Sequence, residues 1–309
     1  MSAIDLSPAD EGDRTLELGK NEVHLTHLEK VYFPQAHVTK GALLHYYAAV
    51  APSLLPHLKH RAMVMKRYPH GVEGPFFYMK RVPVPHPSWL TTCAIDHKSG
   101  NVIDFPIIND LASLLWLVNL GCIDLHPWYG RCGDVDRPDH LHFDLDPGDA
   151  SWTDVVKAGF ILRDVLDGLG MKHVVKTSGS KGLHIYVPLV HGPTQKQVWT
   201  VAKAMSVELA SAHPKLLTAE YRIAKRPAGR VLVDYNQNAW GRTLASVYSV
   251  RPRPNATVSA PVTWKELESG AEIDDFHLGN MPARLKKIGD LWKPVLADQK
   301  GRFDLGALL

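Results

Sequence analysis

The sequence is poor in cysteine, in net charge and in long apolar runs. Its 309 residues include only three cysteines, Cys93, Cys122 and Cys132, and none of them lies in a CxxC pair. A sparse, odd count is typical of a reducing compartment rather than of a disulfide framework. No apolar run is long enough to span a membrane, and the acidic N-terminal residues contain no apolar signal core. We therefore expect a soluble cytoplasmic protein of the bacterial or archaeal nucleoid, with no membrane partner.

A zinc site is a minor alternative for the cysteines. Cys122 and Cys132 lie near His126 and His140 in the sequence. Their spacing matches no standard zinc-binding pattern, so we do not expect such a site.

Charge is distributed unevenly, although the net charge is only +3 and the isoelectric point about 8.6. Residues 59–81 contain six Lys or Arg and one acid, and residues 221–253 contain seven and one. Clusters of this kind suit a surface that binds a polyanion. A solvated basic surface is an equally good explanation on charge alone.

Apolar periodicity and turn residues predict a mixed chain of helices and strands. We expect residues 1–20 to be a mobile polar tail and residues 21–309 to form a single catalytic domain of one or two lobes. Predicted helices begin at caps Thr39, Asn109 and Ser151, and another covers residues 195–212. Predicted strands cover residues 141–146, 173–177, 183–189 and 230–235, with further strands in 62–83.

The run His-Phe-Asp-Leu-Asp-Pro-Gly at 142–148 is the most informative motif. On a strand, residues i and i+2 point to the same face, so Asp144 and Asp146 share one face. These carboxylates repel each other unless a cation lies between them, and a pair of divalent ions would create a two-metal phosphoryl-transfer site. A surface strand that ends in an Asp cap is the alternative.

A third acid, Asp234, ends the apolar run 231–233. A carboxylate at the end of a buried strand is costly unless it is paired or metal-bound. An ion pair with Arg230 is the competing explanation. Three acids at strand ends form a more specific pattern than any one of them alone.

A glycine-rich segment, residues 177–185, lies between these acids in the sequence. It is not a P-loop, because the GxxxxGK[ST] spacing is absent and a strand follows it. Its glycines let backbone N–H groups approach an anion, while Ser178, Lys181 and His184 offer a hydroxyl, a positive charge and an imidazole donor. The segment is suited to hold a triphosphate, and an ordinary hairpin turn is the alternative.

The three motifs, in this order, resemble those of the archaeo-eukaryotic primase superfamily. The closer resemblance is to the polymerase domain of bacterial DNA ligase D, which repairs double-strand breaks by end joining. It runs from about Val23 to Trp264 and includes residues 28–34, 65–77 and 123–128 outside the motifs. It implies a primase-like α+β fold with central, mainly antiparallel sheets and flanking helices.

The resemblance also implies roles for individual residues. Two divalent ions, Mn²⁺ or Mg²⁺, would be bound by the catalytic residues Asp144, Asp146 and Asp234. The incoming nucleotide would be bound by Lys66, His126, Ser178, Lys181, Gly182, His184, Gln237 and Arg251. DNA would be bound by Lys30 and Lys40 at a 5′-phosphate, by Arg67 at the backbone, and by Phe77 and Tyr78 against the template. His27 stands where related sequences can carry Asn, which implies weakened phosphate recognition.

We expect a two-metal nucleotidyltransferase that extends DNA ends and fills gaps in end joining. The resemblance implies NTP or dNTP substrates, with ribonucleotides preferred, and DNA with a 5′-phosphate as partner. The resemblance also implies a Ku-like end-binding protein as a partner. A separate DNA ligase is a further expected partner, because the chain shows no ligase lysine motif. De novo priming and a non-catalytic end-binding role remain the alternatives. Met1 with its acidic leader slightly favours a stand-alone protein over an excised domain.

Overall fold

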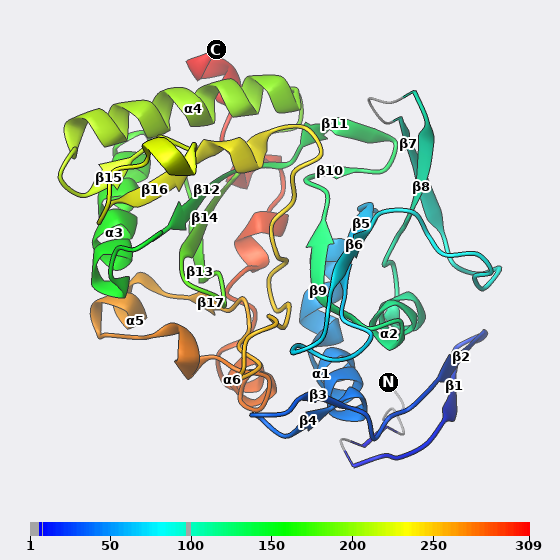
Figure 1. Cartoon of the computed structure of the whole chain (residues 1–309). Helices are drawn as coiled ribbons and strands as arrows, with labels where there is room; N and C mark the ends of the chain where they lie inside the picture. The colour runs from blue at the N-terminus through cyan, green and yellow to red at the C-terminus, as the bar shows by residue number, and fades with distance from the viewer. Residues whose placement is uncertain (1–5, 8, 97–99) are drawn as a thin grey trace. The chain divides into compact units, whose positions relative to one another are not determined.

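Figure 1 shows the computed structural model, which describes residues 6, 7, 9–96 and 100–309. The chain forms two compact units. Unit 1 comprises residues 1–132, 245–259 and 276–289, and unit 2 comprises residues 133–244, 260–275 and 290–309. Both units mix helices and strands, which confirms the predicted α+β class.

Unit 1 contains short hairpins and a three-stranded antiparallel sheet in the order β6-β5-β9. Its strands are β1 (Arg14–Leu18), β2 (Asn21–Leu25), β3 (Val31–Phe33), β4 (Val38–Thr39), β5 (Met63–Arg67), β6 (Phe77–Met79), β7 (Thr92–Asp96), β8 (Val102–Pro106), β9 (Cys122–Pro127) and β10 (Gly130–Arg131). Its helices are α1 (Lys40–Leu58), α2 (Leu111–Asn119) and α6 (Met281–Ile288).

Helix α1 is anchored at its start and along its buried face. The Thr39 hydroxyl accepts the Ala42 N–H at 3.1 Å, which confirms the predicted cap. Tyr47 is fully buried, and its hydroxyl donates to the Ile123 carbonyl of β9 at 2.6 Å. The contact of Tyr47 fixes the helix against β9.

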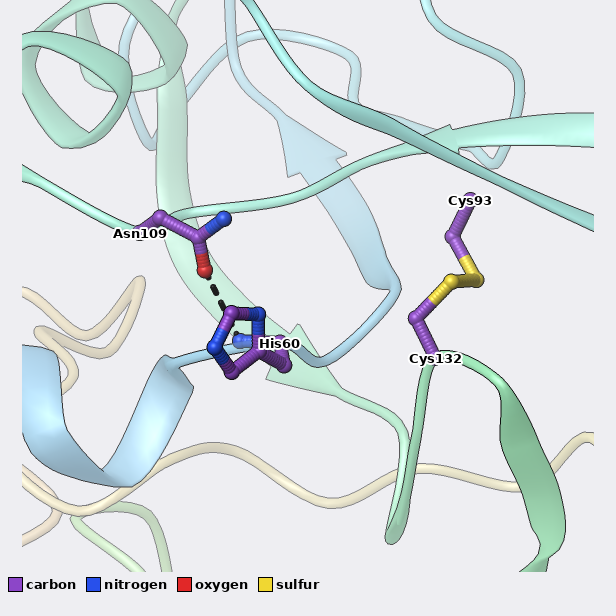
Figure 2. The surroundings of a disulfide bond; sticks show 4 residues. All are labelled: His60, Cys93, Asn109 and Cys132. Atoms are coloured by element: carbon purple, nitrogen blue, oxygen red, sulfur yellow. Dashed lines mark hydrogen bonds between the residues drawn. A yellow bond between two sulfur atoms is a disulfide. The ribbon is translucent and has the colours of Figure 1, made fainter.

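Helix α2 begins one residue later than the sequence predicted. Asp110 is its N-cap, because its carboxylate accepts the Ser113 N–H at 2.8 Å. The Asn109 side chain instead accepts the His60 N–H at 2.9 Å, as Figure 2 shows. The Asn109 side chain, which the local sequence favoured as the cap, is therefore used in a tertiary contact instead.

The expectation for the cysteines was wrong. Cys93 and Cys132 form a disulfide with their Cα atoms 5.9 Å apart (Figure 2). The two residues are 39 positions apart, so only the fold brings them together. This also excludes the zinc alternative, because Cys132 is oxidised and Cys122 is buried, which raises the pKa of its thiol to about 12.

The N-terminal region is more ordered than the predicted polar tail of residues 1–20. Residues 14–18 form β1, which pairs with β2 in an antiparallel hairpin with Leu16 opposite Val23. Leu6 is buried, and its carbonyl lies 2.8 Å from His45 Nδ1. The apolar residues Leu6 and Leu16 explain the difference, since both reach the core of unit 1. Residues 1–5 and 8 of that prediction lie outside the described residues.

Unit 2 is built on a six-stranded sheet in the order β15-β16-β12-β14-β13-β17. Its strands are β12 (His140–Asp146), β13 (Val174–Thr177), β14 (Leu183–Pro188), β15 (Leu217–Thr218), β16 (Val231–Asp234) and β17 (Pro261–Val262), with β11 (Asp134–Pro138) outside the sheet. Every neighbouring pair in the sheet is antiparallel except β15 and β16. The predicted mainly antiparallel sheet is confirmed.

Two long helices, α3 (Trp152–Gly168) and α4 (Gln195–Ala212), contact this sheet, and a short helix, α5 (Trp264–Glu268), follows β17. Ser151 caps α3 as predicted, accepting the Asp154 N–H at 3.1 Å. Gly159 of α3 allows close packing, because a Cβ there would lie 3.1 Å from the Leu183 side chain. The apolar face of β12, with Phe143 and Leu145 fully buried, therefore faces the core.

Residues 270–309 hold short helical segments. Besides α6 these are η3 (Ile273–Asp275), η4 (Lys293–Leu296), η5 (Gln299–Gly301) and η6 (Leu305–Leu308), while η1 (Ile223–Lys225) and η2 (Tyr235–Asn238) lie earlier in the chain. Within the described ranges, no helix combines the length and apolar character needed to cross a bilayer.

Candidate functional site

A row of polar side chains crosses the sheet of unit 2. Pairing of the strands lines up four residues on successive strands: Asp234, Asp144, His184 and Lys176. Directly opposite residues of antiparallel strands project from the same face, so these side chains form one continuous cross-strand row. Asp146 lies two residues beyond Asp144 on β12 and shares its face. The sequence prediction that three distant acids meet on one face is consistent with this register.

The acids of this row interact electrostatically. Burial raises the pKa of Asp234, and the Asp144 carboxylate raises it further, with a smaller effect of Asp146. Hydrogen bonds from the Gln237 side chain at 2.9 Å and the Asn236 N–H at 2.9 Å act in the opposite direction. In the part of the chain that the structure describes, no ion pair joins Asp234 to Arg230. The competing explanation for Asp234 is therefore not supported.

Two cationic or imidazole groups flank the acids. His184 Nε2 lies 3.4 Å from Asp144 Oδ1, and Arg226 Nη1 lies 3.9 Å from Asp146 Oδ2. No three or more His, Cys, Asp or Glu side chains of the described residues are grouped so that they could hold a metal ion. The three carboxylates share a face and repel each other, and their oxygens are the ligands that Mg²⁺ and Mn²⁺ prefer. The donor chemistry fits divalent cations, although the ligand sphere is not assembled.

The glycine-rich loop is folded around the Ser178 hydroxyl. Its oxygen accepts the N–H groups of Ser180, Lys181 and Gly182 at 3.1, 3.1 and 2.9 Å. These are the N–H groups that the sequence suggested for an anion, and here Ser178 satisfies them. An anion bound at the loop would therefore compete with this hydroxyl for the same donors, while the Lys181 side chain is exposed.

Gly182 has a role that the sequence did not reveal. A Cβ at this position would lie 2.1 Å from the carbonyl oxygen of Leu145, so only glycine fits. Leu145 stands between Asp144 and Asp146 on β12. The loop backbone is thus pressed against the strand that carries two of the acids.

In unit 1, three basic side chains surround one buried carboxylate, Asp124 of β9. Its side chain is fully buried, with His126 Nε2 at 3.0 Å from one oxygen and Arg251 Nε at 3.3 Å from the other. Lys66 Nζ lies 4.0 Å away. Burial alone would raise the pKa of this carboxyl, but Arg251 and then His126 hold it well below its usual range, with Lys66 adding less. We call these four residues the Asp124 cluster.

Sequence reasoning named Lys66, His126 and Arg251 but missed Asp124, which connects them. The available signal was its position between Ile123 and Leu125, inside an apolar strand. A carboxylate there requires a partner, by the argument already applied to Asp234.

Exposed aromatic side chains lie beside this cluster. Phe77 and Tyr78 of β6 are 45% and 57% exposed, so neither ring belongs to the core. Lys66 Nζ lies 4.5 Å from the ring centre of Phe76, in cation–π geometry. Arg67 stacks over Phe77 at 5.3 Å and donates from Nε to the Leu120 carbonyl at 2.7 Å. Lys66 and Arg67 are thus held by protein contacts rather than simply solvated.

Lys30 and Lys40 lie close enough to repel each other. Lys40 is buried and donates to the Thr26 carbonyl at 2.6 Å, while Lys30 donates to the Pro69 carbonyl at 2.7 Å. Burial, and then the charge of Lys30, lowers the pKa of Lys40 to about 8. His27 has a positive φ of 55°, and its N–H donates to Asp13 at 2.9 Å. The carboxylates of Asp13 and Glu29 act on the pKa of Lys40 in the opposite direction, so the charge of the pair is partly offset within unit 1.

Residues 39–292 match the family described as "LigD, primase-polymerase domain". The chain belongs to this family. The fold agrees, because the polymerase domain from Mycobacterium tuberculosis ligase D, solved in complex with DNA, is 32% identical with a TM-score of 0.83, over 89% of this chain and 98% of that one. A primase-polymerase domain is a nucleotidyltransferase, so the chain is an enzyme of that class.

Relatives of known type are larger end-joining proteins. The multifunctional non-homologous end joining protein LigD of Mycolicibacterium smegmatis is 35% identical over 89% of this chain and 36% of its own length. The bifunctional non-homologous end joining protein LigD of Bacillus subtilis is 30% identical over 87% of this chain and 43% of its own length. The chain thus spans less than half of the length of either relative.

Proposed function

We propose that the chain extends DNA ends and fills gaps by nucleotidyl transfer in the repair of double-strand breaks by end joining. The observation that carries the proposal is the cross-strand row, in which Asp144 lies opposite Asp234 and beside His184. The end-joining relatives and the DNA-bound structure of a relative's polymerase domain support the choice of DNA as substrate.

Asp144, Asp146 and Asp234 are the proposed ligands of two divalent cations, Mn²⁺ or Mg²⁺. Such ions, when bound, lower the pKa of a primer 3′-hydroxyl and stabilise the charge of the leaving pyrophosphate. Burial and then the Asp144 carboxylate raise the pKa of Asp234, and a cation would relieve the second of these effects, which supports the assignment. The chain's own part is to hold the acids on one rigid sheet face.

The proposed nucleotide-binding residues fall in both units. In unit 2 they are Ser178, Lys181, Gly182, His184 and Gln237, and in unit 1 they are Lys66, His126 and Arg251. Within each unit, the proposed role of these residues is to neutralise and orient phosphate groups of a nucleotide. A preference for ribonucleotides is part of this proposal.

The proposed DNA contacts lie in unit 1. The positive pair of Lys30 and Lys40 would bind a 5′-phosphate, and Arg67 would contact the backbone. The exposed rings of Phe77 and Tyr78 would stack on template bases, since every base offers a π-face. A Ku-like end-binding protein and a DNA ligase activity are the proposed partners in the repair reaction.

Primer extension on a gapped duplex with a 5′-phosphate tests the proposal, with ribo- and deoxynucleotides compared in Mn²⁺ and in Mg²⁺. We expect Asp144→Asn to lower kcat by roughly 1000-fold, because a metal ligand is worth several kcal/mol of transition-state stabilisation. DNA binding should persist. Asp164→Asn, an exposed acid of α3, is the matched control and should extend primers normally.

The outcomes separate the alternatives. Full activity of Asp144→Asn would show that the site is wrongly assigned. Synthesis without a primer on single-stranded template would indicate a priming enzyme instead. A metal-saturated wild-type protein that binds ends and incorporates no nucleotide would indicate a non-catalytic end-binding module.

A further inference from the structure

The last member of the cross-strand row is a lysine in the core of unit 2. Lys176 of β13 is only 1% exposed, and it lies directly opposite His184 of β14. Burying an ammonium group is costly, so its position requires specific compensation. None of the three motifs that suggested the function assigns a role to this residue.

The lysine makes a short hydrogen bond to the imidazole beside it. Lys176 Nζ lies 2.6 Å from His184 Nδ1. An ammonium group has three donors and no acceptor, so a charged Lys176 makes Nδ1 the acceptor of this bond and leaves Nδ1 without a proton. In a neutral imidazole the proton then resides on Nε2. That nitrogen is the one that lies 3.4 Å from Asp144 Oδ1.

Two aromatic rings limit where the ammonium group can go. Nζ lies 5.9 Å from the ring centre of Tyr186 and 5.9 Å from that of Trp292, within cation–π range. Tyr186 and Trp292 also contact each other, with ring centres 5.0 Å apart. The lysine therefore has a defined position, and so does the hydrogen bond that it donates.

We propose that Lys176 is a positioning residue that fixes His184 as the Nε2–H tautomer, with this donor held at the edge of the acid row. His184 can then donate a hydrogen bond toward Asp144 or toward a phosphate oxygen without carrying a positive charge. The part of this inference that concerns a nucleotide rests on the proposed function, whereas the tautomer does not.

The tautomer can be read directly by NMR on the protein without metal or nucleotide. Protonated and bare ring nitrogens give well-separated ¹⁵N resonances, and His184→Gln identifies the signals of this ring by their loss. We expect Nε2–H and a bare Nδ1 in the wild type, and a mixture of tautomers in Lys176→Met. A proton on Nδ1 in the wild type, or an unchanged spectrum in Lys176→Met, would overturn the proposal.

Lys176→Met separates positioning from stability. Replacing a buried charge with an apolar side chain of similar length is often neutral or stabilising, so we expect Tm to be unchanged or higher. Residues that orient a functional side chain by a hydrogen bond, without touching the ligand themselves, typically contribute about 10-fold to affinity or activity. We therefore expect KM for the nucleoside triphosphate to rise about 10-fold, with a smaller change in kcat.

Two further variants complete the experiment. Lys176→Arg keeps a donor and should restore part of the KM effect, whereas the exposed Lys196→Met should leave KM, Tm and the spectrum unchanged. An unchanged KM in Lys176→Met would overturn the nucleotide-binding role. If the wild type incorporates no nucleotide, the proposed function fails, and the NMR result still decides the tautomer.

Discussion

The Asp124 cluster of unit 1 and the cross-strand row of unit 2 are electrostatic opposites. In unit 1 a single buried carboxylate has three basic neighbours, and its pKa is held well below the usual range. In unit 2 acids face each other, and the pKa of Asp234 is raised. In the first arrangement the basic neighbours compensate the charge of the carboxylate, and an excess of positive charge remains. The second leaves repulsion between carboxylates, which is one reason why we propose it as a cation site.

The largest expected effect tests whether the two units depend on each other for stability. The Cys93–Cys132 disulfide lies within unit 1 and closes a loop of 39 residues. Loop-closure entropy predicts that its removal costs about 4 kcal/mol of unfolding free energy. Urea unfolding of Cys93→Ser/Cys132→Ser should show this loss, with the exposed Asp164→Asn as the control.

Hydrogen exchange on the same double variant shows which parts of the molecule lose stability. Amides of α1 and β9 should lose protection, and those of β12 and β14 should keep it. Equal loss in both units would show that the molecule unfolds as one cooperative body.

The next largest effect on stability is expected for Asp124, the carboxylate with three basic neighbours. Asp124→Asn leaves Arg251 and His126 without their buried counter-charge, so we expect a loss of about 3 kcal/mol in unfolding free energy. Asp104, half-exposed and 3.6 Å from Arg81, provides the matched control. Its substitution by Asn should cost less than about 1 kcal/mol, as exposed ion pairs do. Comparable losses in the two variants would contradict the central role of Asp124.

The smallest effect on stability is expected for Asp234, the carboxylate that Asp144 repels. Asp234→Asn removes repulsion with Asp144, and the Gln237 amide can turn to keep a hydrogen bond. Unfolding free energy should stay the same or rise by less than about 1 kcal/mol, while incorporation is lost. A marked destabilisation would show that Asp234 is satisfied inside the protein.

The difference in unfolding free energy between the wild type and each of these two variants should change with pH in opposite directions. The native pKa of Asp124 is depressed, so its stabilising effect is present above the unfolded value near 4 and disappears as pH falls. The native pKa of Asp234 is raised, so its contribution is most favourable at low pH and is lost as pH rises through the native value. Unfolding measured between pH 3 and pH 7, about the range in which carboxyl groups titrate, checks both signs.

Much of unit 2 could be predicted from sequence because its signals are local. The two-residue period of β12 places Asp144 and Asp146 on one face, and Ser151 caps α3 three residues ahead of Asp154. Where the prediction failed, the deciding partner is distant in sequence. Cys93 meets Cys132 only through the fold, and Asp110 becomes the cap of α2 because Asn109 binds the backbone of His60.

Asp124 and Lys176 were overlooked for a related reason. Each is one charged residue within a short apolar stretch, where strand alternation usually places a solvent-facing side chain. Both are instead buried on strands of their sheets. The partner of Lys176 lies on a neighbouring strand. Asp124 has His126 on its own strand, Lys66 on a neighbouring strand, and Arg251 from a segment 127 residues later along the chain of 309. Local periodicity cannot distinguish such a position from an exposed one.

Contact between Gly182 and the Leu145 carbonyl couples two parts of unit 2 mechanically. Because Gly182 has no side chain, the backbone of the glycine-rich loop already packs directly against β12. The loop cannot move closer to this strand or along it without a steric clash. Entry of a nucleotide must therefore be accommodated by the outer residues of the loop, such as Lys181, while its base stays seated on the acid-bearing strand. A methyl group at position 182 would lift the whole loop and change the distance between phosphate donors and carboxylates in a single step.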